Sequence, residues 1–246
     1  MKLLTFAFIA SSVLAVAAQN PPTQQSQQPA EIATRIGVDP GRPPRLAIPE
    51  FIPLSKDADL LSAARTIADV LFDDMAFEKE FYMIPKDILR TVPRPNSAEE
   101  ATLDRWKELG ADGVVIGTVQ KTTEGIVVEV RLMRVVNGAM SLGKKYTGSP
   151  KSIVDGGRTF AHSIADEIHK QQANIRGVAR TKLAFSSDRD GIRMKGPVGD
   201  RDVSNIYMSD YDGANQTRVT VNRSIDIAPA WSPTGQQLAF TSDRGG

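Results

Sequence analysis

Ala184-Phe185-Ser186-Ser187-Asp188-Arg189 is repeated near the end of the chain as Ala239-Phe240-Thr241-Ser242-Asp243-Arg244, 55 residues further on (239 minus 184). The turn Asp210-Tyr211-Asp212-Gly213 and the phrase Trp231-Ser232-Pro233-Thr234-Gly235 lie between the two copies. A repeat of about 40–50 residues, built from short strands and turns rich in Gly and Asp, is typical of a β-propeller blade. We therefore expect residues 177–246 to form the first part of an all-β propeller, which favours recognition over catalysis.

The residues that carry this repeat are expected to have structural roles. They are Asp188, Arg189, Asp212, Gly213, Trp231, Ser232, Pro233, Gly235, Asp243 and Arg244. An active site is rarely copied once per blade, so we expect the two Asp-Arg phrases to pair and hydrogen-bond between neighbouring strands or blades. Trp231 is expected in a blade core, and Gly213 in a tight turn.

The spacing of the repeat predicts further features of this region. Short strands are expected at 182–186, 205–209, 217–221, 228–231 and 237–241. The repeat exceeds a typical blade by about 10 residues, which we assign to an enlarged surface loop over Ile192–Ser204. A ring of four to eight blades needs several times more chain, and the first phrase has no Trp-Ser-Pro strand before it. We therefore expect a C-terminally truncated fragment of a longer reading frame.

An α/β domain is expected over residues 45–176. Its first strand is Arg45–Phe51, and a helix from Asp57 carries apolar residues at i, i+3, i+4 and i+7. A short strand follows at 81–84. Ser97 with Glu100 three residues later indicates a capping box, which predicts a second helix ending at Gly110.

The second half of this domain is expected to contain three antiparallel strands and a helix. The strands are 113–121, 126–136 and 140–147, and Asn137-Gly138 indicates a hairpin turn. After Pro150 a helix is expected with Ile153, Gly157, Phe160, Ile164 and Ile168 on one stripe. The order βαβαβββα predicts a mixed sheet covered by helices.

The N-terminus has the pattern of an export signal over residues 1–18. Lys2 supplies the positive charge, an apolar stretch follows, and small residues allow cleavage after Ala17 or Ala18. Residues 19–44 form a flexible or extended segment, which we call the lead segment. Its Gln- and Pro-rich first part cannot bury a core, whereas Glu31–Pro44 reads either as an extended strip that lies on another surface or as a plain linker.

The composition excludes several classes of chemistry. The chain has 246 residues, a net charge of +1 and no cysteine. The absence of cysteine excludes disulfides, thiolate nucleophiles and lipidation on cysteine, and the balanced charge argues against a nucleic-acid partner.

No catalytic, metal or cofactor site is predicted. His162 and His169 lie seven residues apart on one expected helix, and two such histidines do not reach one ion without help. Asp166 and Glu167 are expected on the solvent face of that helix. Asp200-Arg201-Asp202 begins like a calcium loop but lacks its glycine and its final glutamate, and no Gly-x-Ser-x-Gly motif is present.

Nearly all of the chain after the signal resembles the TolB family of the Tol–Pal system in Gram-negative bacteria. Besides the propeller phrases, the residues that carry this resemblance are Gly37-Val38-Asp39-Pro40-Gly41-Arg42-Pro43, Ala47-Ile48-Pro49-Glu50-Phe51 and Leu109-Gly110-Ala111-Asp112 with the strand Gly113–Gly117. The Gln- and Pro-rich stretch before Glu31 and the first-blade loop are both longer than is usual in that family.

The resemblance implies a periplasmic scaffold without catalytic activity. Its implied partners are the peptidoglycan-associated outer-membrane lipoprotein Pal and inner-membrane Tol proteins such as TolA, and its implied role is outer-membrane integrity and constriction at division. Partner contact is carried over onto Ile36, Gly37, Val38, Asp39, Gly41, Arg42 and Pro43. Two alternatives remain open: the N-terminal part of an exported propeller-containing serine peptidase, and an exported propeller with an unknown ligand.

Overall fold

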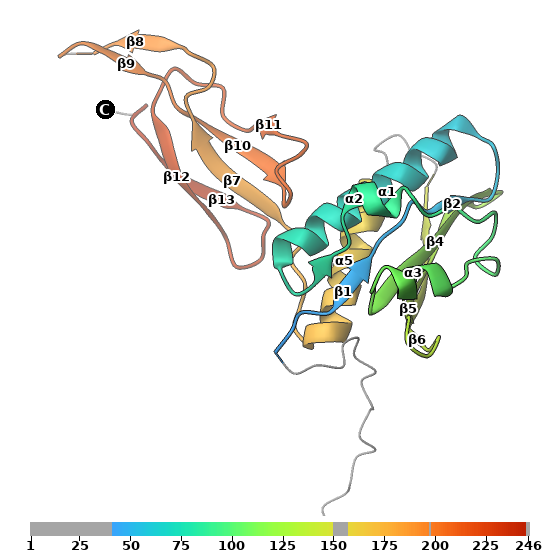
Figure 1. The fold of residues 1–246 in the computed structure, drawn as a ribbon. Coiled ribbons are helices and arrows are strands. Elements are labelled where there is room, and N and C mark those ends of the chain that lie inside the picture. Colours follow the sequence, from blue (N-terminus) through green and yellow to red (C-terminus); the bar gives the residue numbers. More distant parts are fainter. Residues whose placement is uncertain (1–40, 150–156, 197, 245–246) are drawn as a thin grey trace, which may run out of the picture. The chain divides into compact units, whose positions relative to one another are not determined.

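The computed structural model describes residues 41–149, 157–196 and 198–244. Its first part is an α/β domain whose elements are shown in Figure 1. They are β1 (Arg45–Ala47), β2 (Ile52–Pro53), α1 (Ala58–Glu78), β3 (Tyr82–Met83), α2 (Lys86–Leu89), α3 (Asp104–Glu108), β4 (Gly113–Thr122), β5 (Gly125–Arg134), β6 (Met140–Gly148) and α5 (Arg158–Ala173). The sheet has the order β3-β1-β4-β5-β6, with β2 also paired to β4. The neighbours of β1 are parallel and the β4-β5-β6 strands are antiparallel, so the expected mixed sheet is confirmed.

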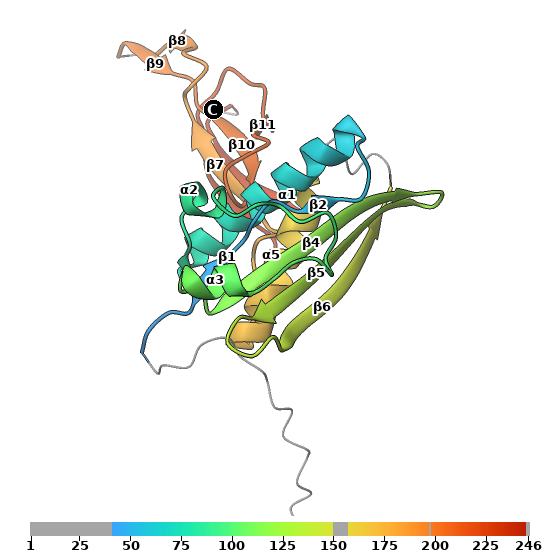
Figure 2. The same ribbon diagram turned by 45° about the vertical axis from the view of Figure 1, so that its right-hand side comes forward.

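Strand β4 is buried on both faces and separates two apolar cores. Val115 and Val119 face one core, which α1 and α5 cover, and Val114 and Ile116 face the other. This alternation follows from the period of two in a strand. Trp106 of α3 is buried in the second core, and α3 and α5 lie on opposite faces of the sheet (Figure 2).

The residues just before the two long helices, α1 and α5, favour the start of a helix. Asp57 caps α1, since its carboxylate accepts hydrogen bonds from the backbone N–H groups of Asp59 and Leu60. Gly157 lies just before α5 with a φ of 75°, a conformation that glycine adopts without steric cost. Gly157 was expected on the apolar face of this helix, but it lies before the first helical residue. Of the other stripe residues, Phe160, Ile164 and Ile168 are buried, and Ile153 lies outside the described residues.

Two expectations for the first half of the domain were wrong in detail. The strand expected over 45–51 ends at Ala47, before Pro49, which has no N–H to donate to a ladder, and β2 begins only at Ile52. The expected helix after Ser97 begins only at Asp104: Ser97 Oγ does accept from Glu100 N–H at 3.3 Å, but in an isolated turn. The short strand expected at 81–84 is β3, which ends before Pro85. Pro85 then precedes the short helix α2, where a missing N–H costs nothing.

In the second part of the chain, the repeat region, all regular elements of the described residues are strands. They are β7 (Lys182–Ser187), β8 (Arg193–Lys195), β9 (Asp200–Asp202), β10 (Asn205–Asp210), β11 (Thr217–Arg218), β12 (Asp226–Trp231) and β13 (Leu238–Ser242). Their sheets are β11-β10-β7, β12-β13 and β8-β9, all antiparallel. The two copies of the repeated phrase lie on β7 and β13.

One expectation for the repeat region is refined and one needs correction. The enlarged surface loop expected over Ile192–Ser204 contains a hairpin, because β8 and β9 pair within it. Trp231 is not in a blade core. It is 38% exposed, because it lies on β12, whose sheet contains two strands in the described part of the chain.

Candidate functional site

The lead segment is described only at its end. Ile36, Gly37, Val38 and Asp39 lie outside the described residues, so partner contact through them stays a prediction. Gly41, Arg42 and Pro43 are exposed and lead directly into β1. The N–H of Arg45 donates to the Asp112 carboxylate at 2.7 Å, so the chain that follows the lead segment is fixed to the sheet within a few residues.

The repeated arginines lie over aromatic rings. Arg189 lies 5.1 Å from the ring centre of Phe185 and 4.7 Å from that of Tyr207, and Arg244 lies 5.4 Å from Phe240. A guanidinium above an aromatic face is attracted by the ring quadrupole. Each copy of the phrase therefore uses its arginine to cover the phenylalanine of its own strand.

The repeated acidic and turn residues bond to the backbone. Asp243 accepts a hydrogen bond from Ile225 N–H at 2.8 Å and pairs with Arg201 at 3.3 Å. In the turns, the N–H of Gly213 donates to Asp210 C=O, and the N–H of Gly235 donates to Ser232 C=O. The C=O of Asp188 accepts from Gly191 N–H in the same way. Pro233 lies within the Ser232–Gly235 turn.

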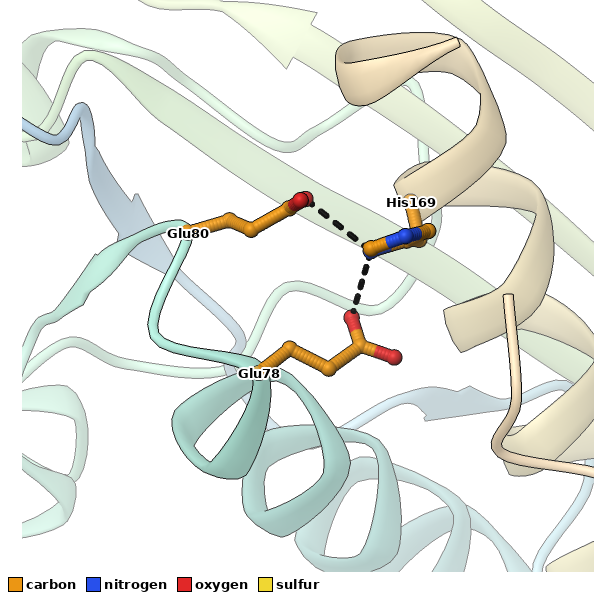
Figure 3. Close-up of side chains that lie close together, drawn as sticks. All are labelled: Glu78, Glu80 and His169. Carbon is orange, nitrogen blue, oxygen red and sulfur yellow. Dashed lines mark hydrogen bonds and ion pairs between the residues drawn. The ribbon is translucent and has the colours of Figure 1, made fainter. Parts of the chain in front are cut away.

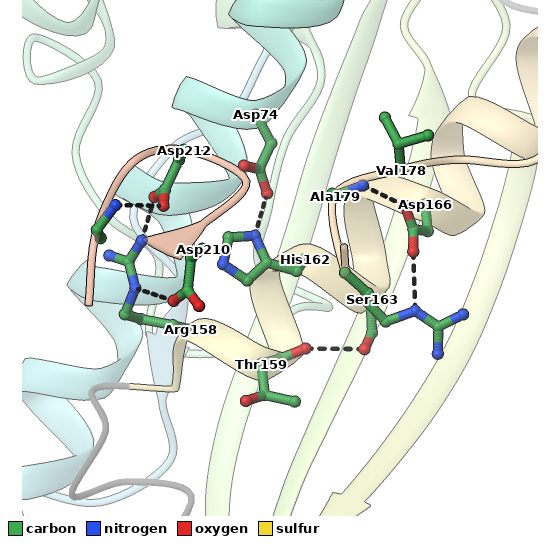
Figure 4. Close-up of polar contacts among 12 residues, drawn as sticks. Asp74, Arg158, Thr159, His162, Ser163, Asp166, Val178, Ala179, Asp210 and Asp212 are labelled. Carbon is green, nitrogen blue, oxygen red and sulfur yellow. Dashed lines mark hydrogen bonds and ion pairs between the residues drawn. The ribbon is translucent and has the colours of Figure 1, made fainter. Parts of the chain in front are cut away.

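The turn Asp210-Tyr211-Asp212-Gly213 does more than reverse the chain. Tyr211 packs against the core beneath α1 and α5, and its ring meets the edge of the Phe77 ring at 5.2 Å and 86°. Arg158, the first residue of α5, forms ion pairs with Asp212 and, at 3.7 Å, with Asp210 (Figure 4). We call these contacts of the turn with α1 and α5 the junction.

A histidine–carboxylate pair lies beside the junction. His162 Nδ1 lies 2.8 Å from Asp74 Oδ2 (Figure 4), and both side chains are buried. Burial raises the pKa of the Asp74 carboxyl, although the hydrogen bond from His162 opposes this. A carboxylate oxygen of Asp210 lies within 4.8 Å of a ring nitrogen of His162, and burial acts to raise the pKa of Asp210 as well. Hydrogen bonds from Lys182 and Asn215 nevertheless lower the pKa of Asp210.

The linker that follows α5 is held by Asp166. Its carboxylate accepts from Ala179 N–H and from Arg180 Nε, each at 2.8 Å, and its side chain is only 12% exposed. The expectation that Asp166 is an ordinary solvent-face residue was therefore wrong, because the linker folds back over that face. Glu167 pairs with Lys144 on the exposed side.

His169 contacts two carboxylates at the end of α1. Its Nδ1 lies 3.1 Å from Glu78 Oε2 and 3.0 Å from Glu80 Oε2 (Figure 3). Burial raises the pKa of Glu78 from 4.5 to about 7. The charge of His169 opposes this rise, and the charges of Glu80 and Asp74 add to it. Each histidine therefore has acidic partners of its own, and we call Glu78, Glu80 and His169 the α1-end cluster.

The raised pKa of Glu78 gives a testable pH dependence. A carboxyl whose pKa is higher in the folded state stabilises the fold while protonated, and this contribution is lost as the pH rises through about 7. In a chelating buffer, Glu78→Gln should therefore raise the melting temperature relative to the parent at pH 8 and much less at pH 5. Glu124→Gln, at an exposed hairpin turn, is the control and should show no such difference. An equal effect of Glu78→Gln at both pH values would contradict the assignment.

Sequence reasoning did not find the junction or the α1-end cluster. The one available signal was the spacing of these residues along each helix: Asp74 and Glu78 are four apart on α1, and His162 and His169 are seven apart on α5. Both spacings place side chains on one helix face. Nothing in the sequence showed that the two faces meet.

A pocket of about 360 Å³ lies on the other side of the domain, between α2 and β2. Its lining includes Glu50, Lys86 and Arg94 with Phe72 and Trp106. Lys86 pairs there with Asp69 and Asp73, and Arg94 with Glu50. The charges of Lys86 and Arg94 are therefore neutralised by the acidic side chains beside them.

No helix among the described residues is long and apolar enough to span a membrane.

The chain is similar to proteins of one family. A family model described as the TolB amino-terminal domain matches residues 15–141. The Tol-Pal system protein TolB of Desulfosudis oleivorans is 32% identical over 203 residues, which are 82% of this chain and 43% of the relative. The corresponding protein of Mannheimia succiniciproducens is 31% identical over 247 residues, 98% of this chain and 52% of the relative.

A solved structure supports the same fold. The crystal structure of TolB from Acinetobacter baumannii has a TM-score of 0.59 and 20% identity, and the match covers 81% of this chain and 44% of that one. The chain spans about half the length of the curated relatives it matches.

Proposed function

The chain belongs to the TolB family, and from this premise we propose that it is a protein-binding scaffold of the Tol–Pal envelope system. Its partners would be the lipoprotein Pal on the outer-membrane side and inner-membrane Tol proteins, TolA among them. Its role would be outer-membrane integrity and constriction at division. The membership confirms the resemblance carried by the lead segment, the first strands and the propeller phrases.

We propose that the protein acts in the periplasm and has no catalytic activity. The export pattern of residues 1–18 supports the location. Membership of the TolB family supports a non-catalytic role.

The junction is the structural observation that best supports a scaffold whose two parts influence one another. Arg158 and Phe77 of the α/β domain contact the turn Asp210–Gly213 of the repeat region, so the two parts are joined by specific contacts as well as by the linker. Packed and ion-paired contacts of this kind can carry the effect of a partner bound to one part into the other. We propose that docking or release of the lead segment biases what the repeat region binds.

Deletion of Glu31–Pro43 from a full-length version of the protein tests this coupling. The deletion leaves the sheet untouched, because β1 begins at Arg45. We expect loss of TolA binding and a changed affinity for Pal, measured by calorimetric titration of each partner. Replacing Glu31–Thr34 with Gly and Ser at the same length is the matched control, because it keeps the proposed contact residues. Unchanged affinity for both partners after the deletion would contradict the proposal.

A further inference from the structure

The α1-end cluster contains more acceptors than donors. Nδ1 of His169 carries either one N–H or one lone pair, yet two carboxylate oxygens lie 3.1 and 3.0 Å from it. A single proton satisfies one of the two contacts. Oε1 of Glu78 and Oε2 of Glu80 are buried without a hydrogen-bond partner among the described residues, and the Glu78 side chain is only 4% exposed.

The charge of the cluster is also unbalanced. Two glutamates face one histidine. None of the ion pairs within residues 41–149, 157–196 and 198–244 joins a Lys or an Arg to either glutamate. Glu78 is the last residue of α1, and His169 lies near the end of α5. The two helices run in the same direction, since Asp74 meets His162 and Glu78 meets His169. The partial negative charge of both C-terminal ends adds to that of the carboxylates.

The other acidic cluster beside α5 is different. His162, Asp210 and Asp212 also bring potential ligand atoms within 4.8 Å of one another. There, however, Arg158 pairs with both aspartates and Lys182 with Asp210, so the negative charge is already neutralised. The excess of negative charge is found at the α1-end cluster.

We propose that Glu78, Glu80 and His169 form a binding site for a divalent transition metal, best represented by Zn²⁺. Zinc binds imidazole nitrogen and carboxylate oxygen at about 2.0–2.2 Å with tetrahedral geometry, which places neighbouring ligand atoms about 3.3 Å apart. The observed separations of 3.0 and 3.1 Å are close to that value. The Glu80 side chain is 25% exposed, so an ion has access from solvent and water can take the fourth position.

A metal at this site would fasten the end of α1 to α5 next to the junction. Glu78 follows Phe77, whose ring contacts Tyr211 of the repeat region. Metal binding would therefore stabilise the surface on which the junction turn rests.

Titration of the chelator-treated protein with Co²⁺ tests the proposal, because four-coordinate Co²⁺ absorbs visible light. We expect one equivalent to bind and to be displaced by Zn²⁺. Glu78→Gln, Glu80→Gln and His169→Gln should each weaken binding by at least about tenfold, since even the loss of a residue that only orients a metal ligand costs about that much. Asp210→Asn is the matched control at the other cluster and should bind as the parent does.

Two outcomes would overturn the proposal. One is the absence of four-coordinate Co²⁺ absorption in the parent protein, which needs no variant. The other is a spectrum that survives Glu78→Gln and is lost in Asp210→Asn. Circular dichroism of each variant shows that it is folded, and Glu78→Gln is nearly isosteric and removes only a buried charge.

Discussion

Arg158→Ala is expected to release the Asp210–Gly213 turn from the α/β domain. The guanidinium is 20% exposed and pairs with Asp212, 16% exposed, and with Asp210, 7% exposed. Its loss leaves Asp212 without its cationic partner in a partly desolvated site. Breaking a buried ion pair costs about 3–5 kcal/mol, and we expect the lower end of that range here. Hydrogen exchange should accelerate around residues 210–214 and in the first turn of α5.

Lys144→Ala is the matched control for this prediction. It removes an ion pair of α5 with β6, in which Lys144 is 42% exposed. An exposed pair contributes about 0–1 kcal/mol, so exchange near the junction should not change. Equal stability and exchange in Arg158→Ala and the parent would show that the junction does not depend on Arg158.

Gly177→Val is expected to displace the linker between the two parts of the chain. A Cβ at this position would lie 2.5 Å from Asp166 Cα and 2.4 Å from its Oδ1. The backbone of α5 cannot yield, so the linker has to move and the hydrogen bond from Ala179 N–H to Asp166 is lost. Overpacking costs about 1–3 kcal/mol, and a buried acceptor left without its donor adds about 1–3 kcal/mol. Both costs lower the stability of the fold, and their combined effect is measured as a lower melting temperature of Gly177→Val relative to the parent.

Arg180→Ala separates this effect from a simple loss of charge. It removes the second donor to Asp166, but Arg180 is 62% exposed, so the cost should stay below about 1 kcal/mol. A crystal structure of Gly177→Val with the linker unmoved would contradict the steric account.

Periodicity in the sequence predicted the elements that depend on neighbours along the chain. The apolar spacing after Asp57 gave α1, and the turn Asn137-Gly138 gave the hairpin between β5 and β6. These features are local, so the information lies within one helix or one turn. Pro49 was harder to interpret, because the strand expected to run through it ends at Ala47.

The contacts that define the candidate site are long-range. Asp74 meets His162 from 88 residues away, and Glu78 meets His169 from 91 residues away. A single sequence shows that Asp166 and the histidines share a helix, but not which surface covers them. For the same reason the Asp210–Gly213 phrase was predicted as a turn without its contacts to Phe77 and Arg158.

Calorimetric titration of Pal into a full-length version of this protein tests the proposed function most directly. We expect saturable one-to-one binding that is weakened by Arg158→Ala, because the junction joins the α/β domain to the repeat region. No binding of Pal by a protein that circular dichroism shows to be folded would contradict the proposed function.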